Sequence, residues 1–192
     1  MEWTYKDYTF RTVETFEEPL FSELMKKVFF EEFPSIDMKQ VLSEQEKQKA
    51  AEFRNKFKDR YHLRIAVYHG PAFVGWTFGW QESDHSFYMG MSAVLPEHRN
   101  KGIYTELVSA VLKITREEGF QSVYSNHLVA NSNVLIPKLK LGFTIAGMEM
   151  LEWVGLVVKL VFYHQPTRKD IYQYRVGMAP PSEVIKKLLG YN

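Results

Sequence analysis

The order of apolar and polar positions divides the chain into strand-like and helix-like segments. Residues 3–13 alternate between apolar and polar side chains over much of their length, which predicts a strand. Apolar residues spaced three and four apart then predict a helix that Pro19 opens and Pro34 ends. A second helical segment is expected over residues 37–58, and the polar stretch 43–49 predicts a break or a frayed turn within it.

Three strands follow and run directly into a helix. Residues 63–68, 73–80 and 86–95 are rich in aromatic and β-branched side chains, and turns containing Gly, Pro, Asp and Ser separate them. This pattern predicts an antiparallel meander. Helical spacing of Ile, Leu and Val follows over residues 102–118, and a further strand is expected at 122–129.

A short helix and an apolar hairpin complete the pattern. Residues 131–133 are Asn, Ser and Asn, which are side chains that cap helix N-termini, so a helix is expected to begin there. The apolar runs 143–153 and 156–164, divided by Gly155, predict a hairpin. Beyond them, residues 172–176 predict an edge strand and residues 182–189 a terminal helix.

Composition narrows the class of protein. The 192 residues suit one domain, spanning residues 1–192, of mixed α+β type. The 24 Lys and Arg nearly balance 23 Asp and Glu, which argues against a protein that neutralises a nucleic-acid backbone. The chain has no cysteine, no leader-like start and no uncharged apolar run near eighteen residues, so we expect a soluble cytoplasmic protein without a membrane or nucleic-acid partner.

The most informative stretch is the connection between the third strand of the meander and the helix that follows. An apolar strand ending near Val94 passes through a short polar turn into a helix from about Gly102. The first N–H groups of a helix have no intrahelical acceptor and lie at the positive end of its dipole, so this geometry seats a phosphate. The alternative is an ordinary strand-turn-helix connection without a ligand.

Two segments carry a resemblance to a known family. The spacing Arg99-x-x-Gly102-x-Tyr104 resembles the acyl-CoA loop of the GNAT superfamily of N-acetyltransferases, although Tyr104 replaces the family's usual Gly or Ala. A second segment, which begins at Asn131 and ends in residues 139–143 (Leu-Lys-Leu-Gly-Phe), is similar to the family element that follows about thirty residues later.

The resemblance implies a fold and a binding mode for acetyl-CoA. The fold would be a mixed, largely antiparallel sheet that is splayed in the middle and flanked by helices on both faces, with the carrier in the gap. Backbone groups of Ser92, Ala93 and Val94 would pair with the pantetheine arm, and the Val94 N–H would face the thioester oxygen. Asn131 would touch the carrier from the other side. The residues that would seat the pyrophosphate, through amides or positive charge, are Arg99, Asn100, Lys101, Gly102, Ile103, Tyr104 and Thr105.

The same resemblance leaves the proton-transfer groups unsettled. The family's two usual positions for a carboxylate base fall on Met89 and Asn126, and neither side chain can take a proton. Lys138 stands where the family usually has Tyr. It is either a proton donor to the leaving thiolate or a solvated surface charge.

Other candidates lie on or near the same strands. Glu82 and His85, in the turn before the third strand of the meander, either act through a water molecule or are simply exposed. Trp80, Tyr124 and Asn126 are candidate contacts for the acceptor. His127 alternates away from Asn126 and is therefore expected to face the opposite layer.

These observations predict an N-acetyltransferase that moves an acetyl group from acetyl-CoA to a primary amine by direct attack in a ternary complex, without a metal. Two alternatives remain at this point. One is a catalytically weak or inactive module that binds acyl-CoA and regulates, and the other is an interaction protein that binds no CoA. The apolar hairpin and the expected edge strand also suit a homodimer.

Overall fold

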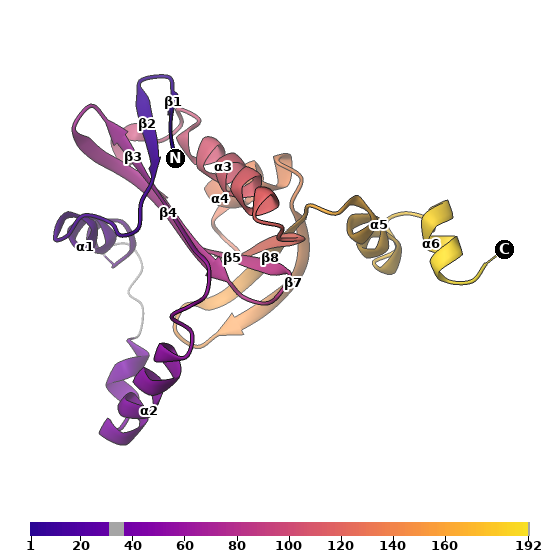
Figure 1. Ribbon diagram of the computed structural model, residues 1–192, viewed down its shortest axis with the longest axis horizontal. Helices are drawn as coiled ribbons and strands as arrows, with labels where there is room; N and C mark the ends of the chain where they lie inside the picture. Colours follow the sequence, from indigo (N-terminus) through magenta and orange to yellow (C-terminus); the bar gives the residue numbers. More distant parts are fainter. Residues whose placement is uncertain (31–36, 192) are drawn as a thin grey trace.

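The computed structural model describes residues 1–30 and 37–191, and its eight strands form one sheet in the order β1-β2-β3-β4-β5-β6-β8-β7 (Figure 1). The strands are β1 Glu2–Tyr5, β2 Tyr8–Thr12, β3 His62–His69, β4 Ala72–Gln81, β5 Ser86–Val94, β6 Ser122–Leu128, β7 Thr144–Leu151 and β8 Gly155–Tyr163. The α-helices are α1 Leu20–Met25, α2 Glu44–Asn55, α3 Ile103–Glu117, α4 Ser132–Lys140, α5 Pro166–Arg175 and α6 Glu183–Leu188.

The sheet is antiparallel except between β5 and β6, and there it splits. These two strands run parallel and pair at three positions only, of which Tyr88 opposite Tyr124 is the last. β5 continues to Val94 and β6 to Leu128 without pairing to each other. The expected mixed, largely antiparallel sheet with a splay in its middle is therefore confirmed.

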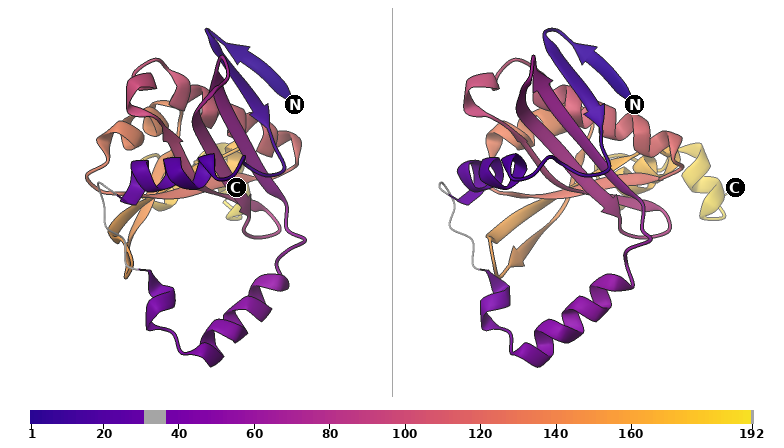
Figure 2. Two further views of the ribbon diagram at one scale, coloured as in Figure 1. Left: turned by 90° about the vertical axis from the view of Figure 1, so that its left-hand side faces the viewer. Right: turned by 60° about the vertical axis from the view of Figure 1, so that its left-hand side comes forward.

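Helices cover both faces of the sheet, as expected. On one face, apolar side chains of α3 such as Leu107 and Val111 pack against β5 and β6, and Leu135 of α4 joins the same core. On the other face, Phe21 of α1 packs against Trp76 of β4. Figure 2 shows α1 and α3 on opposite sides of the strands. We call these two surfaces the α3 face and the α1 face.

The N-terminal segment differs from its prediction. Residues 3–13 form a hairpin of β1 and β2 instead of one strand, because the chain reverses at Lys6 and Asp7, where Lys6 has φ of 52°. No Gly or Pro marks this turn, so its sequence does not resemble a typical hairpin turn. The predicted end of the first helix at Pro34 lies outside the described residues.

Two further segments correct the sequence analysis. Residues 172–176 are not an edge strand: residues 172–175 end α5 and Val176 is its C-cap, because Pro166 opens a helix there and the Gln165 side chain caps it. The break in the second helical segment falls before Ser43, whose side chain forms a capping box with Glu46. The polar residues 43–49 therefore begin α2 in place of interrupting it.

Two parts of the chain extend from the sheet (Figure 1). One carries α2, and the other is the C-terminal pair α5 and α6. The predicted hairpin of β7 and β8 is confirmed, with β7 at the edge of the sheet. None of the described helices is both long and apolar enough to cross a membrane.

Candidate functional site

The free edge of β5 faces the gap between β5 and β6. The Leu95 N–H donates to the Val74 carbonyl at 2.9 Å, and Val94 lies opposite Gly75 in the adjacent register position. Because antiparallel pairs alternate between bonded and non-bonded positions, the polar backbone groups of Val94 and Ser92 point away from β4 and toward the gap. Those of Ala93 point to β4. The gap is thus bordered by the N–H groups of Ser92 and Val94, which β6 does not reach.

The turn after β5 leads to an N-terminus of α3 that carries no side-chain cap. Gly102 occupies the N-cap position with φ of 87°, and no side chain accepts a hydrogen bond from the first turn. Glu106 is the first residue whose N–H reaches a carbonyl of the helix start, that of Gly102. The N–H groups of Ile103, Tyr104 and Thr105 therefore have no intrahelical acceptor.

Cationic and polar side chains surround this helix start. Arg99, Asn100, Lys101 and Thr105 are exposed. The Arg99 Nε donates to the Val94 carbonyl at 3.0 Å, which holds its positive charge beside the free edge of β5. An anion placed at the N-terminus of α3 would meet backbone N–H donors and positively charged side chains together.

Tyr104, the residue that departs from the family pattern, turns its side chain into the protein. Its ring packs on the main core, and its hydroxyl is buried without a hydrogen-bond partner. Burial raises the pKa of the Tyr104 hydroxyl. The Tyr104 side chain therefore does not occupy the exposed surface of the turn, while the Tyr104 N–H remains in the first turn of α3.

The β1-β2 hairpin supports the turn from behind. The Lys6 Nζ donates to the Lys101 carbonyl at 3.0 Å, and the Trp3 Nε1 donates to Glu106 at 3.0 Å. A Cβ atom on Gly102 would lie 2.5 Å from the Tyr5 hydroxyl oxygen. Gly102 is thus required by its positive φ and by its contact with Tyr5.

The far side of the gap ends at Asn131, which precedes α4. Asn131 is the N-cap residue by position, but its side chain makes no capping hydrogen bond and is exposed. The helix expected to begin at residues 131–133 does begin there, but without a capping hydrogen bond from the Asn131 side chain.

Lys138 is the largest departure from the sequence analysis, because it is completely buried and not a solvated surface charge. Its Nζ donates to the Ser125 hydroxyl at 2.6 Å and to the Met89 sulfur at 3.3 Å, and it lies 4.8 Å from the centre of the Phe143 ring. Met89 and Ser125 each follow one residue after the last β5-β6 pair. The Lys138 amine therefore lies where the two strands begin to separate, on the α3 face.

The surroundings of Lys138 disfavour its charge. Burial lowers the pKa of Lys138 to about 7, since no carboxylate compensates the loss of hydration. The next side chain of the cluster is His127, whose Nε2 lies 2.8 Å from the Ser125 hydroxyl oxygen. Burial and the nearby Lys138 lower the pKa of His127 to about 3. His127 faces the α3 layer, as its alternation with Asn126 predicts.

Aromatic and polar side chains gather on the α1 face of the same point. Tyr88 stacks edge-on against Trp80, with ring centres 4.8 Å apart, and Tyr88 and Tyr124 are 5.0 Å apart. The Trp80 Nε1 donates to the Glu82 carboxylate at 3.0 Å. Burial and then the charge of Glu82 raise the pKa of both tyrosines. Asn126, next to this cluster, has a buried Oδ1 without a partner.

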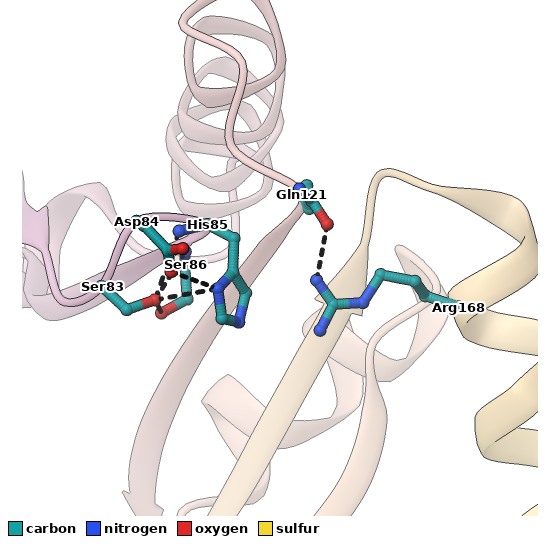
Figure 3. Close-up of polar contacts among 6 residues, drawn as sticks. All are labelled: Ser83, Asp84, His85, Ser86, Gln121 and Arg168. Atoms are coloured by element: carbon teal, nitrogen blue, oxygen red, sulfur yellow. Dashed lines mark hydrogen bonds and ion pairs between the residues drawn. The ribbon is translucent and has the colours of Figure 1, made fainter.

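Glu82 and His85 do not act as a pair in this structure. Figure 3 shows the His85 ring against Asp84 and Ser83 in the turn, with Nδ1 2.6 Å from the Asp84 carboxylate. The same view shows Arg168 of α5 donating to the Gln121 side chain at 2.8 Å. In contrast to His85, the Glu82 carboxylate accepts a hydrogen bond from the Trp80 Nε1 and lies near Tyr88 and Tyr124. Of the two, Glu82 lies with the side chains at the splay.

Ser125 and its link to Lys138 are the part of the site that the sequence analysis missed. A usable pattern was present, because Lys138 lies three residues from both Leu135 and Leu141, which pack inward. Ser125 and His127 are two apart on a strand and therefore share a face. Among the described residues, no group of three or more His, Asp or Glu side chains could hold a metal ion.

A separate pocket of ≈ 640 Å³ lies toward the other end of α3. Its lining includes Lys113 and Arg116 of α3 and Phe162 and His164 near the end of β8. It does not include the turn after β5 or the residues at the splay.

Comparison of the sequence with models of known protein families finds a matching family. A model of the acetyltransferase (GNAT) family matches residues 21–143, a span that contains α3, the splay and the end of α4. Among curated proteins, no sequence matches the chain.

Solved structures with the same fold share little sequence with the chain. The ribosomal-protein-S5-alanine acetyltransferase from Vibrio fischeri is 11% identical with a TM-score of 0.62, over 86% of this chain and 97% of that one. A chain of the NatC complex bound to Gag peptide and CoA is 18% identical with a TM-score of 0.61, over 83% and 99%. A GNAT family acetyltransferase from Elizabethkingia anophelis with acetyl-CoA bound is 10% identical with a TM-score of 0.55, over 83% and 99%.

Substituting Gly102 tests the support of the turn. Gly102→Ala is expected to destabilise the protein more than Gly119→Ala, because both residues have positive φ but only Gly102 would clash with Tyr5. Urea unfolding of the two variants measures the difference. Adding Tyr5→Phe to Gly102→Ala should recover part of it, whereas equal losses in the two single variants would contradict the contact.

Substituting Lys138 tests its burial. Because its pKa is about 7 when folded and higher when unfolded, the unfolded chain binds more protons between pH 7 and about 10, and stability rises with pH in that window. Lys138→Met removes the pH dependence that Lys138 gives to the free energy of unfolding, which is up to about 1.4 kcal/mol per pH unit. The variant should be at least as stable as the wild type at pH 7, with its advantage shrinking toward pH 10.

The exposed Lys140 of the same helix provides the control for this experiment. Lys140→Met should change the free energy of unfolding by an amount that does not vary between pH 7 and 10. If Lys138→Met behaves like Lys140→Met, the Lys138 amine is hydrated in solution and its assigned environment is wrong.

Proposed function

Because the chain belongs to the GNAT family of acetyltransferases, we propose that it transfers an acetyl group from acetyl-CoA to a primary amine by direct attack in a ternary complex. The observation that carries the proposal is that two sets of unpaired backbone donors lie on one connected segment, the N–H groups of Ser92 and Val94 in the gap and those of the first turn of α3. Such a line fits an extended ligand that ends in a diphosphate. Two solved structures of the same fold have CoA or acetyl-CoA bound.

The carrier is proposed to occupy the gap. The polar backbone groups of Ser92 and Val94 would pair with its amide-bearing arm, as a β-strand would. Its diphosphate would lie on the first turn of α3, with the charges of Arg99 and Lys101 nearby. Asn131, uncapped at the other arm of the gap, would contact it from the opposite side. Asn100, Gly102, Ile103, Tyr104 and Thr105 would contribute backbone amides.

Acetyl-CoA supplies the thioester, and the chain supplies groups that stabilise the transfer. The Val94 N–H is proposed to donate to the thioester oxygen as negative charge develops there, a type of contact worth about 3 kcal/mol in a water-poor site. Lys138 is proposed to donate a proton to the leaving sulfur. A pKa of about 7 suits this role, because such a group both holds and releases a proton near neutral pH.

The acceptor amine is proposed to approach from the α1 face. Trp80, Tyr124 and Asn126 would contact it there, with the unpartnered Asn126 Oδ1 ready to accept a hydrogen bond. Glu82 would take the amine proton, through a water molecule where needed. Its place beside Tyr88 and Tyr124 supports Glu82 over His85, which is bound to Asp84. Small amines, amino acids, antibiotics and protein N-termini all fit this proposal.

A second candidate is a carrier-binding regulatory module with weak or no transfer activity. The observation that favours it is the absence of a carboxylate at residues 89 and 126, where Met and Asn flank the splay. Both candidates require binding of CoA. They differ in whether thiol is released when an amine is added.

Charge reversal at Lys101 tests the proposed diphosphate site. Lys101→Glu should weaken CoA binding by about tenfold or more, because it places a negative charge beside the phosphates at the start of α3. Isothermal titration calorimetry with CoA measures the dissociation constant. Lys113→Glu is the matched control, because Lys113 is an exposed lysine within α3 that lines the separate pocket. A loss of affinity only in Lys113→Glu would move the site to that pocket.

A panel of primary amines, followed by thiol release from acetyl-CoA, tests the transfer reaction. With an amine that reacts, Glu82→Gln is expected to lower kcat/KM by about 100-fold, as is typical when a general base is lost. Glu152→Gln, an exposed residue in the β7-β8 turn, should leave the rate unchanged. Tight CoA binding without thiol release from any amine would favour the regulatory module.

A further inference from the structure

A chain of three hydrogen-bonding side chains crosses from α4 to β6 on the α3 face. The Lys138 Nζ donates to the Ser125 hydroxyl at 2.6 Å, and the same hydroxyl oxygen lies 2.8 Å from the His127 Nε2. Lys138 and Ser125 are both fully buried. Two short contacts through one shared hydroxyl form a continuous path between the lysine and the histidine.

The lysine has no other route to water within this cluster. Its other hydrogen-bond and ring contacts among the described residues are to the Met89 sulfur and the Phe143 ring, and neither exchanges protons with solvent. Ser125 is its one oxygen partner among the described residues. A buried amine that gives up a proton must regain one before the next reaction, and Ser125 is the group through which it can do so.

The other end of the path reaches solvent. His127 is partly exposed, in contrast to Lys138 and Ser125. Its Nδ1 has no protein partner among the described side chains, and it does not belong to the buried polar atoms that lack one. Water therefore reaches Nδ1 while Nε2 faces Ser125.

We propose that Ser125 and His127 relay a proton from solvent to Lys138 after each transfer, so that the lysine is recharged without leaving its buried position. This inference rests on the proposed function, in which Lys138 protonates the leaving sulfur. Ser125 and His127 act through Lys138 and are positioning residues, since neither is proposed to touch the substrates.

Each proton that the lysine gives to the leaving group is replaced through the serine and the histidine. An Nζ–H bond of the lysine breaks and an S–H bond forms on the leaving group, which leaves Lys138 neutral. The Ser125 hydroxyl then gives its proton to Nζ and takes one from the His127 Nε2, while water supplies a proton to Nδ1. The histidine exchanges one neutral tautomer for the other and never has to carry a charge. The first tautomer is restored when the partly exposed ring turns about its Cβ–Cγ bond, so that Nε2 meets water and takes up a proton while Nδ1 loses one, and then turns back.

The groups around the path agree with a neutral relay. Met89 from β5 and Phe143 after α4 are uncharged, and His127 is the titratable side chain that faces Lys138. A permanently charged histidine beside the lysine would repel its ammonium form. A neutral imidazole can accept and donate in the same position without that repulsion.

Removing the shared hydroxyl tests the relay in the intact protein. Ser125→Ala should lower kcat by about tenfold or more while the KM for acetyl-CoA changes little, because recharging is slowed and binding is not. Ser125→Thr, which restores a hydroxyl, should recover most of the rate. Ser122→Ala on the same strand is the matched control and should resemble the wild type. Unchanged kcat in Ser125→Ala would overturn the relay.

His127→Gln separates a relay from a hydrogen bond that only positions Ser125. Glutamine can still bond to the Ser125 hydroxyl, but its amide cannot shift a proton between two nitrogens. The relay predicts that His127→Gln lowers kcat about as much as Ser125→Ala. A wild-type rate in His127→Gln would remove histidine from the path.

A measurement without acetyl-CoA keeps the relay separate from the proposed function. In protein labelled with 15N at lysine, NMR can follow how fast the Lys138 Nζ protons exchange with water. This exchange should slow by about tenfold in Ser125→Ala and stay unchanged in Ser122→Ala. Slowed exchange without thiol release in the wild type would retain the path and reject the transfer reaction. Unchanged exchange would reject the path itself.

Discussion

The separation of β5 from β6 is the constraint on which the rest of the structure depends. Within a sheet, neighbouring strands normally satisfy each other's backbone groups, and a buried N–H without an acceptor is unfavourable. Here the pairing stops after Tyr88 and Tyr124, and the Val94 N–H points into the gap. The same strand then leads through a supported turn into an uncapped helix. Backbone geometry alone thus creates a line of donors that an extended, anionic carrier can satisfy.

Lys138 shows how this site differs from a simple binding groove. A buried amine without a carboxylate partner is costly for stability, and an apolar residue of similar size would serve packing better. The amine nevertheless lies at the point where the strands separate, in contact with Ser125 and Met89. On the opposite face, Tyr88 and Tyr124 lie at the same point. In the proposed reaction the two faces would therefore offer different chemistry to one reacting centre, with a proton donor on one and polar aromatic contacts on the other.

Much of this arrangement could be predicted from the sequence. The strand, turn and helix around Gly102 follow from local patterns, and the spacing of Arg99 and Gly102 indicated the family. His127 was assigned to the correct layer by strand alternation. Lys138 was harder, because lysine is usually solvated, although its spacing from Leu135 and Leu141 placed it on the inner stripe of α4. Its contact with Ser125 depends on how α4 packs over β6, which no local pattern specifies. The turn at Lys6 was missed because no glycine marks it, and α5 was missed because its apolar residues are few.

The most direct test of the central claim is residue-resolved amide hydrogen exchange with and without CoA. We expect CoA to protect the Val94 N–H and the N–H groups of residues 103–105, while amides at the C-terminal end of α3 change little. CoA binding that leaves the Val94 amide and the first turn of α3 unprotected would contradict the account, because the carrier would then lie outside the gap between β5 and β6.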